Sequence, residues 1–160
     1  MAWLAWLAQL GERWNVQIYQ GIFGEEYKQL LRRSRIVFNR GIRGECNMRA
    51  FEAAAAGALL FQEVENREVH TYFRDRQECV YYTDENLEEL LEYYLQHAEE
   101  RRVIAEAAQA KVLEYTFGKL WDSALAVIDE ELAGRKSESR GQKAAGGPAM
   151  RACGRLGGAL

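Results

Sequence analysis

The sequence predicts an α/β protein built on a partial doubly wound parallel sheet with flanking helices. The main evidence is the order strand, loop, helix, strand over residues 36–62, where two apolar runs enclose an alanine-rich segment that ends at Gly57. Successive strands joined through a helix are parallel. The same alternation continues to Tyr82, and 160 residues with 48% hydrophobic content are enough to bury one core.

The spacing of apolar residues places the elements of this fold in order. Large apolar residues at the start of the chain predict an amphipathic helix, and these are Trp3, Leu7, Leu10 and Trp14. Runs rich in β-branched and aromatic residues predict strands at 16–19, 36–39, 59–61 and 79–82. Helical spacing predicts helices at 24–33, 47–56, 68–73 and 87–97, and a long helical stretch at 99–132.

Two of these helices carry more detailed predictions. In the helix at 47–56, the spacing assigns Met48, Phe51 and Ala55 to the core. The long stretch is predicted to break near residues 116–118, where β-branched, aromatic and glycine residues fall together.

The charge of the chain is unevenly distributed. Residues 1–134 carry 15 basic and 23 acidic residues, which gives a net charge of −8. Such an acidic body repels phosphate backbones, so nucleic acid is not an expected partner. Residues 135–160 form a basic Gly- and Ala-rich tail with few large apolar groups, which predicts disorder. The predicted domains are therefore 1–134 and the tail 135–160.

The cysteines and the N-terminal segment exclude several classes of protein. Cys46, Cys79 and Cys153 are odd in number and far apart, so neither a zinc site nor a disulfide framework is predicted. The apolar start of the chain lacks a basic region and is too short to span a bilayer. A cytoplasmic protein without a metal, a cofactor or a membrane span is expected.

Three segments carry a resemblance to a known family: YKQLLRRSRIVFN at 27–39, RGECNMR at 43–49 and FEAAAAGA at 51–58. They resemble glycosyltransferases of the GT-B fold, in particular the C-terminal, donor-binding domain of the group-1 type found in spore maturation glycosyltransferase-like proteins. The resemblance covers roughly residues 21–117. It implies a Rossmann-like domain that binds a nucleotide-diphosphate sugar for transfer to an unknown acceptor.

The resemblance also implies what such a domain needs around it. GT-B enzymes place an acceptor domain before the donor domain and set the catalytic base between the two. The chain is therefore expected to be incomplete at its N-terminus and inactive without an upstream domain or a partner chain. The last helix of such enzymes crosses back to the acceptor domain, so an exposed apolar face around Trp121 and Leu125 is expected.

The helix that begins near Asn47 is the predicted centre of the nucleotide-sugar site. Its first turn presents unpaired amides and the positive end of the helix dipole, which suits a diphosphate. The family has a glutamate in this helix that holds the ribose of the donor, and Glu52 occupies that position. Helical side chains lean toward the N-terminus, so Glu52 can reach toward a ribose next to that diphosphate.

Three arginines are candidates for the phosphate groups: Arg43, Arg49 and Arg67. Many relatives carry a second glutamate that contacts the sugar, and Gly44 stands at its position. The neighbouring Glu45 is a candidate substitute that is out of register by one residue. Asn-Arg-Glu at 66–68 replaces a Gly-Gly pair and a glutamate, and the metal-binding Asp-x-Asp motif of other glycosyltransferases is absent.

Other interpretations remain open at this point. The arginines could instead pair with Glu45, Glu63 and Glu65 while Glu52 faces solvent. The missing second glutamate and upstream half favour a non-catalytic interaction or scaffold module that retains the glycosyltransferase fold. A flavodoxin-like domain is a weaker alternative, because its strands normally end in acidic residues or a hydroxyl-rich phosphate loop.

Overall fold

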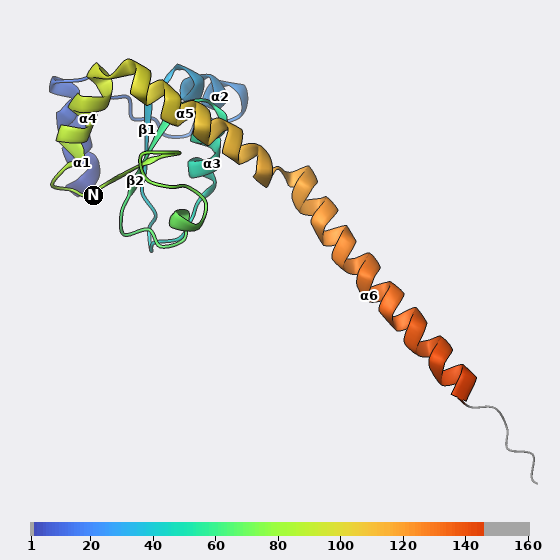
Figure 1. Cartoon of the computed structure of the whole chain (residues 1–160). Helices are drawn as coiled ribbons and strands as arrows, with labels where there is room; N and C mark the ends of the chain where they lie inside the picture. Colours follow the sequence, from blue (N-terminus) through green and yellow to red (C-terminus); the bar gives the residue numbers. More distant parts are fainter. Residues whose placement is uncertain (1, 146–160) are drawn as a thin grey trace, which may run out of the picture. The chain divides into compact units, whose positions relative to one another are not determined.

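A computed structural model describes residues 2–145 of the chain, with side chains described over residues 3–135. The chain divides into two compact units, and the boundary lies after Glu114. The first unit contains a three-stranded parallel sheet with helices against both faces (Figure 1). This arrangement confirms the predicted α/β fold class.

The sheet consists of β1 (Ile36–Asn39), β2 (Leu59–Glu63) and β3 (Val80–Tyr82) in the order β1-β2-β3. Its register pairs Ile36 with Leu59 and Asn39 with Gln62 across β1 and β2, and Phe61 with Val80 across β2 and β3. Side chains alternate between the two faces along each strand. Asn39 and Gln62 therefore lie side by side on one face, at the carboxyl ends of the strands.

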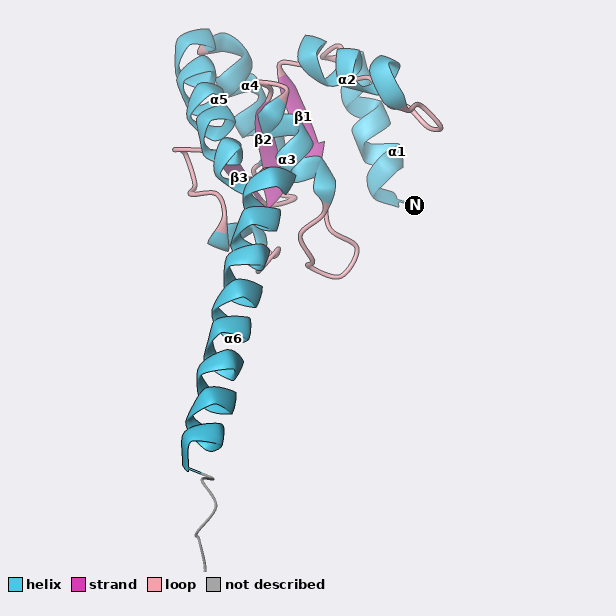
Figure 2. Ribbon diagram, turned by 90° about the vertical axis from the view of Figure 1, so that its right-hand side faces the viewer, coloured by secondary structure: helices cyan, strands magenta, loops and turns pink. Residues whose placement is uncertain are grey.

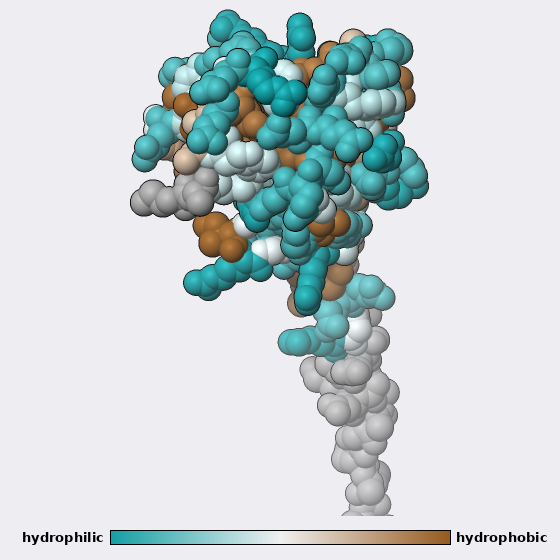
Figure 3. Space-filling view, turned by 90° about the vertical axis from the view of Figure 1, so that its left-hand side faces the viewer, coloured by the Kyte–Doolittle hydropathy of each residue, from teal (hydrophilic) through white to brown (hydrophobic). Residues whose placement is uncertain are grey.

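The helices of the first unit follow the predicted order. They are α1 (Ala2–Gln9), η1 (Leu10–Glu12), α2 (Gly24–Arg33), α3 (Met48–Ala55), η2 (Val69–Thr71), α4 (Leu87–Gln96) and α5 (Ala98–Val112). In Figure 1, α1 and α4 lie on one side of the sheet and α2 and α3 on the other. Seen from the side of α1 and α4, the surface is mostly hydrophilic, with separate hydrophobic patches (Figure 3).

Two buried clusters hold these layers together. One cluster joins the α2 and α3 face to the sheet through Leu31, Val37, Ala50, Ala53, Ala54, Leu60 and Tyr81. The other joins the α1 and α4 face through Leu7, Leu10, Leu59, Phe61, Val80, Tyr82, Leu91 and Tyr94. α5 contributes to both clusters, through Ala108 and Val112 to the first and through Ile104 and Ala105 to the second. The three alanines of α3 let this helix pack closely on the strands.

Three local predictions were wrong. The predicted strand at 16–19 is irregular chain, and the amide of Val16 donates to the carbonyl of Trp14 (2.8 Å), a turn that takes this group out of any ladder. The predicted helix at 68–73 is only the short 3₁₀ turn η2. Met48 and Ala55 are exposed rather than part of the core, because the smaller Ala50, Ala53 and Ala54 face the sheet.

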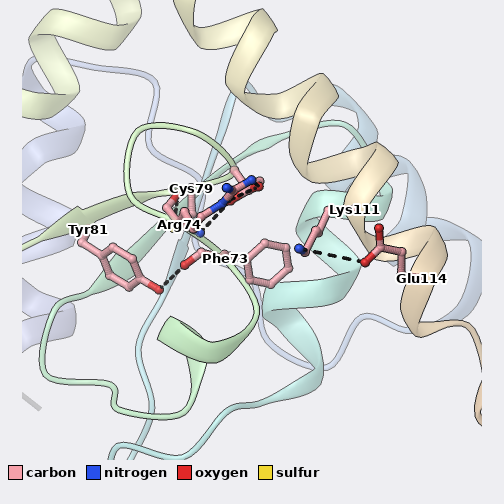
Figure 4. Close-up of polar contacts among 7 residues, drawn as sticks. Phe73, Arg74, Cys79, Tyr81, Lys111 and Glu114 are labelled. Carbon is pink, nitrogen blue, oxygen red and sulfur yellow. Dashed lines mark hydrogen bonds and ion pairs between the residues drawn. The ribbon is translucent and has the colours of Figure 1, made fainter.

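The turn between η2 and β3 is fixed by a buried carboxylate. Glu78 accepts hydrogen bonds from the backbone amide (2.7 Å) and the Nε atom (3.1 Å) of Arg74. Figure 4 shows Arg74 in this turn. In the same view, the hydroxyl of Tyr81 donates to the carbonyl of Phe73 (2.9 Å). The hydrogen bond from the Arg74 side chain lowers the pKa of Glu78, with burial acting in the opposite direction.

Glu78→Gln is expected to lower the stability of the protein at neutral pH by about 1–3 kcal/mol, since a buried hydrogen-bonded charge is lost. The folded-state pKa of Glu78 lies below its ordinary value of 4.5, so its contribution is complete above that value and is lost as the pH falls through the folded value. Urea unfolding of both proteins between pH 7 and pH 3 measures this. A stability difference that stays constant across that range would contradict the assignment.

The second unit contains the helix α6 (Phe117–Ala145), which follows the 3₁₀ turn η3 (Leu113–Tyr115). Thr116 lies between the two, and its hydroxyl accepts a hydrogen bond from the amide of Lys119 (3.4 Å), so the predicted break is confirmed. Trp121 and Leu125 are exposed, as expected. α6 continues past the predicted boundary at residue 134. The rest of the predicted tail, residues 146–160 with Cys153, lies outside the described residues.

Candidate functional site

The candidate site lies at the edge of the sheet toward which the strands point. The loop at 40–47 leaves β1 there and leads into α3, while the segment after Glu63 leaves β2 (Figure 2). Open parallel sheets bind ligands at this edge, because loops and helix N-termini converge outside the carboxyl ends of the strands. A surface depression of about 670 Å³ lies between these two segments. It is lined by Ile42, Arg43, Gly44, Glu45, Arg67 and Glu68.

The carboxylates of this depression are bound to backbone amides. Glu45 accepts hydrogen bonds from the amides of Arg43 (2.7 Å) and Ile42 (3.2 Å). Glu68 accepts one from the amide of Cys46 (2.7 Å). Hydrogen bonds from backbone amides, its own first and then that of Arg43, lower the pKa of Glu45. These acidic side chains therefore stabilise the conformation of the loop.

The two arginines of the depression are exposed and carry no ion pair within the described part of the chain. Glu45, one proposed alternative partner of Arg43 and Arg67, holds backbone amides instead, and so does Glu63, which accepts from the amide of Gly41 (2.6 Å). Two guanidinium groups thus remain available to a ligand. Each can donate two parallel hydrogen bonds to a phosphate group.

The remaining predicted residues lie along the start of α3 rather than in the depression. Asn47 precedes the helix in extended conformation and makes no side-chain capping bond, so the first amides of α3 are not covered by it. Its Oδ1 atom is buried and has no hydrogen-bond partner among the described residues. Arg49 is exposed in the first turn of the helix.

Glu52 lies in the second turn of α3 and is half-buried. One of its carboxylate oxygens, Oε2, accepts a hydrogen bond from the hydroxyl of Tyr27 on α2 (2.8 Å). Burial, followed by this hydrogen bond to Glu52, raises the pKa of Tyr27. Tyr27 therefore remains a hydrogen-bond donor at neutral pH and orients the carboxylate. The alternative of a freely solvated Glu52 does not describe this geometry.

Sequence reasoning missed a chain of buried polar groups directly beneath the depression. The Nδ2 atom of Asn39 donates to Gln62 (2.7 Å), and the side chain of Gln62 donates to Glu63. Asn66 donates to Glu63 (3.3 Å) and to the backbone carbonyl of Glu45 (2.8 Å). The available signal was that polar residues directly follow two apolar runs, which places them at the same edge of a parallel sheet.

The described residues offer neither a metal-ion site nor a membrane-spanning helix. No group of three or more His, Cys, Asp or Glu residues in this part of the chain is arranged to hold a metal ion. None of its helices combines the length and the apolar character needed to cross a membrane.

Comparison with known proteins gives the family. A search of curated proteins finds no match to this chain. Residues 3–126 match the family described as glycosyl transferase-like, a region that includes the sheet, the depression and Glu52. The match covers well over half of the chain. The chain therefore belongs to the glycosyl transferase-like family and contains a glycosyltransferase-type domain.

Proposed function

We propose that this domain binds a nucleotide-diphosphate sugar, with the diphosphate in the depression and the ribose at Glu52. Membership of the glycosyl transferase-like family supports a sugar donor. The observation that carries the proposal is the pair of guanidinium groups, those of Arg43 and Arg67, which line one depression without an ion pair among the described residues. Two exposed cations beside a helix N-terminus suit a dianionic ligand.

The diphosphate would bind in the depression, between the loop at 42–45 and the segment at 67–68, and would extend toward the first turn of α3, which follows the loop. The amides of this loop already hold Glu45, so they are not the main donors. The donors that remain are the two arginines, the uncapped start of α3 after Asn47 and the exposed Arg49. Arginine suits this role because its planar guanidinium matches the geometry of phosphate oxygens.

The ribose would follow along α3 toward Glu52. The rise of the helix from Asn47 to Glu52 is about 7.5 Å, and helical side chains lean back toward the N-terminus. Tyr27 holds the Oε2 atom of the carboxylate, and no hydrogen bond engages Oε1 within the described part of the chain. This second oxygen can accept a hydrogen bond from a ribose hydroxyl.

Donor binding would be one half of the transfer reaction. In GT-B relatives the acceptor and the catalytic base lie between this type of domain and a second one. We therefore propose that the acceptor and the base for this protein come from another domain or a partner chain, and that the chain alone does not transfer sugar. Turnover of a nucleotide sugar by the pure chain would contradict this.

Glu52→Ala is expected to weaken nucleotide binding by about tenfold, the equivalent of one hydrogen bond to a charged group. The test is a thermal melt with and without millimolar uridine, guanosine and adenosine diphosphates and their sugar conjugates. A ligand at about 100 times its dissociation constant adds roughly 2.7 kcal/mol of stability. One nucleotide should therefore raise the Tm of the wild type, and this rise should shrink in Glu52→Ala.

The matched control is Glu26→Ala, which removes an exposed glutamate from α2 and should leave the rise in Tm unchanged. If no nucleotide moves the Tm of the wild type, the donor site is refuted. That result would favour the non-catalytic scaffold, which keeps the fold without its ligand.

A further inference from the structure

The carboxylate of Glu63 lies at the end of β2, beneath the loop that lines the depression. Its side chain is almost fully buried, with 4% of the residue exposed. Oε1 accepts hydrogen bonds from the amide of Gly41 (2.6 Å) and from Nδ2 of Asn66 (3.3 Å). Oε2 accepts a hydrogen bond from the side-chain amide of Gln62. Oε1 thus connects the loop after β1 to the end of β2, while Oε2 is held by the neighbouring residue of β2.

Asn66 makes a second connection between the same two segments. It is fully buried, and its Nδ2 atom also donates to the carbonyl of Glu45 (2.8 Å). Its Oδ1 atom accepts a hydrogen bond from the amide of Val69 (3.1 Å), at the start of η2. Asn66 therefore ties the loop that carries Arg43 to the segment that carries Arg67, which is the next residue in the chain.

Gly41 shows how closely the loop is held. A Cβ atom at this position would lie 2.8 Å from the carbonyl oxygen of Glu45, 3.0 Å from Nδ2 of Asn66 and 3.2 Å from Oε1 of Glu63. Such contacts are shorter than packed atoms tolerate, so only glycine fits here without a shift of the loop. The loop is folded directly onto Glu63 and Asn66.

We propose that Glu63 and Asn66 are positioning residues that hold Arg43 and Arg67 around one depression, ready for a diphosphate. The choice of a diphosphate as ligand rests on the proposed function, whereas the positioning of the loop rests on the hydrogen bonds of Glu63 and Asn66. A loop fixed before binding avoids the entropy cost of ordering it when the ligand arrives. Without the hydrogen bonds of Glu63 and Asn66, the loop that carries Arg43 would not be held in place. The diphosphate would then bind to one fixed arginine, Arg67, instead of two.

The chemistry of Glu63 supports a role in shaping the site rather than in stability. Burial raises the pKa of Glu63, although the charge of Arg40 and the bonds from Gly41 and Asn66 act in the opposite direction. A raised folded-state pKa means that ionised Glu63 costs stability as the pH rises above its ordinary value of 4.5. A neutral amide would avoid this cost, but it cannot accept hydrogen bonds on both of its terminal atoms.

The test compares Glu63→Gln with Glu78→Gln. Both variants replace a buried glutamate by its amide, but Glu78 lies in the turn before β3 and touches no residue of the depression. Binding of uridine, guanosine and adenosine diphosphate is measured by calorimetry well below the Tm of each variant. Hydrogen exchange of the amides of Gly41 and Cys46 is followed by NMR in the absence of ligand.

In Glu63→Gln, the Gly41 amide should exchange about tenfold faster and the nucleotide should bind roughly tenfold more weakly, because Gly41 and Asn66 then donate to a neutral amide oxygen instead of a carboxylate. Glu78→Gln should change neither quantity, although its Tm falls. Equal weakening in both variants would show a general effect of stability and overturn the inference. Unchanged exchange at Gly41, or faster exchange with unchanged affinity, would overturn it as well.

Two further outcomes remain distinguishable. If the wild type binds none of the three nucleotides, the proposed function fails, while the exchange rates still decide whether Glu63 holds the loop. If Glu63→Gln does not fold, Asn66→Ser replaces it, because that variant keeps the charge of Glu63 and removes the bonds from Nδ2 of Asn66 to the carbonyl of Glu45 and to Oε1 of Glu63. The same two measurements then apply, with the same results required.

Discussion

The double variant Arg43→Gln and Arg67→Gln is expected to lose nucleotide binding almost completely. Each guanidinium supplies charge-assisted hydrogen bonds to the diphosphate, and a loss of about tenfold for each gives roughly a hundredfold for both. Both side chains are exposed and make no ion pair within the described part of the chain, so their removal should leave the Tm nearly unchanged. Calorimetric titration with the nucleotide that stabilises the wild type measures the loss.

The matched control removes two positive charges elsewhere. Arg32→Gln with Arg33→Gln changes the exposed last turn of α2 by the same net charge and should keep the wild-type affinity within about twofold, since surface charges at a distance are screened. If both double variants weaken binding equally, attraction by overall charge explains the binding. The arginines would then not form a specific phosphate site.

The sheet was largely predictable from the sequence because its signals are local. The run at 36–39 becomes β1 without a change in its bounds, since β-branched and aromatic residues there are followed by a polar loop and a helix. The similar run at 16–19 fails because a strand also needs a neighbour, and the turn at Val16 removes it from the ladder. Pairing partners are non-local, and a run of four residues does not encode them.

The exposed arginines of the site could be predicted from the sequence, but the buried residues that hold their loops in place could not. Arg43 and Arg67 stand out as charged residues in polar loops. Glu63 and Asn66 read equally well as solvated loop residues, because the sequence does not show that β2 runs on to Glu63. Their burial follows from the register, which places Asn39 beside Gln62 and turns the end of β2 under the loop after β1. The face on which a strand residue lies depends on its odd or even position along the strand and on the register of strand pairing. Register is set by the tertiary structure and is not visible in the sequence.

Phe61→Ala is expected to destabilise the first unit by about 3–5 kcal/mol, the usual cost of removing a buried aromatic ring. Phe61 lies on the central strand and is fully buried. Its ring packs against Phe38 (5.7 Å between centroids), Tyr94 (5.9 Å) and Tyr82 (6.4 Å). The three neighbouring rings belong to β1, β3 and α4, and each of them packs against Phe61. Because they are held by different elements, they cannot move together to fill the cavity that Phe61→Ala leaves.

This loss is a large part of the 5–15 kcal/mol that stabilises a typical domain, so the variant should be partly unfolded near 37 °C. Urea unfolding followed by circular dichroism measures it, with Phe23→Ala as the control, because Phe23 is 81% exposed and its removal should change stability by less than about 0.5 kcal/mol. Equal midpoints for the two variants would mean that Phe61 does not sit at the centre of the core. Because Phe61 packs on the α1 and α4 face, away from the depression, Phe61→Ala should bind nucleotide with wild-type affinity at 5 °C, where it remains folded.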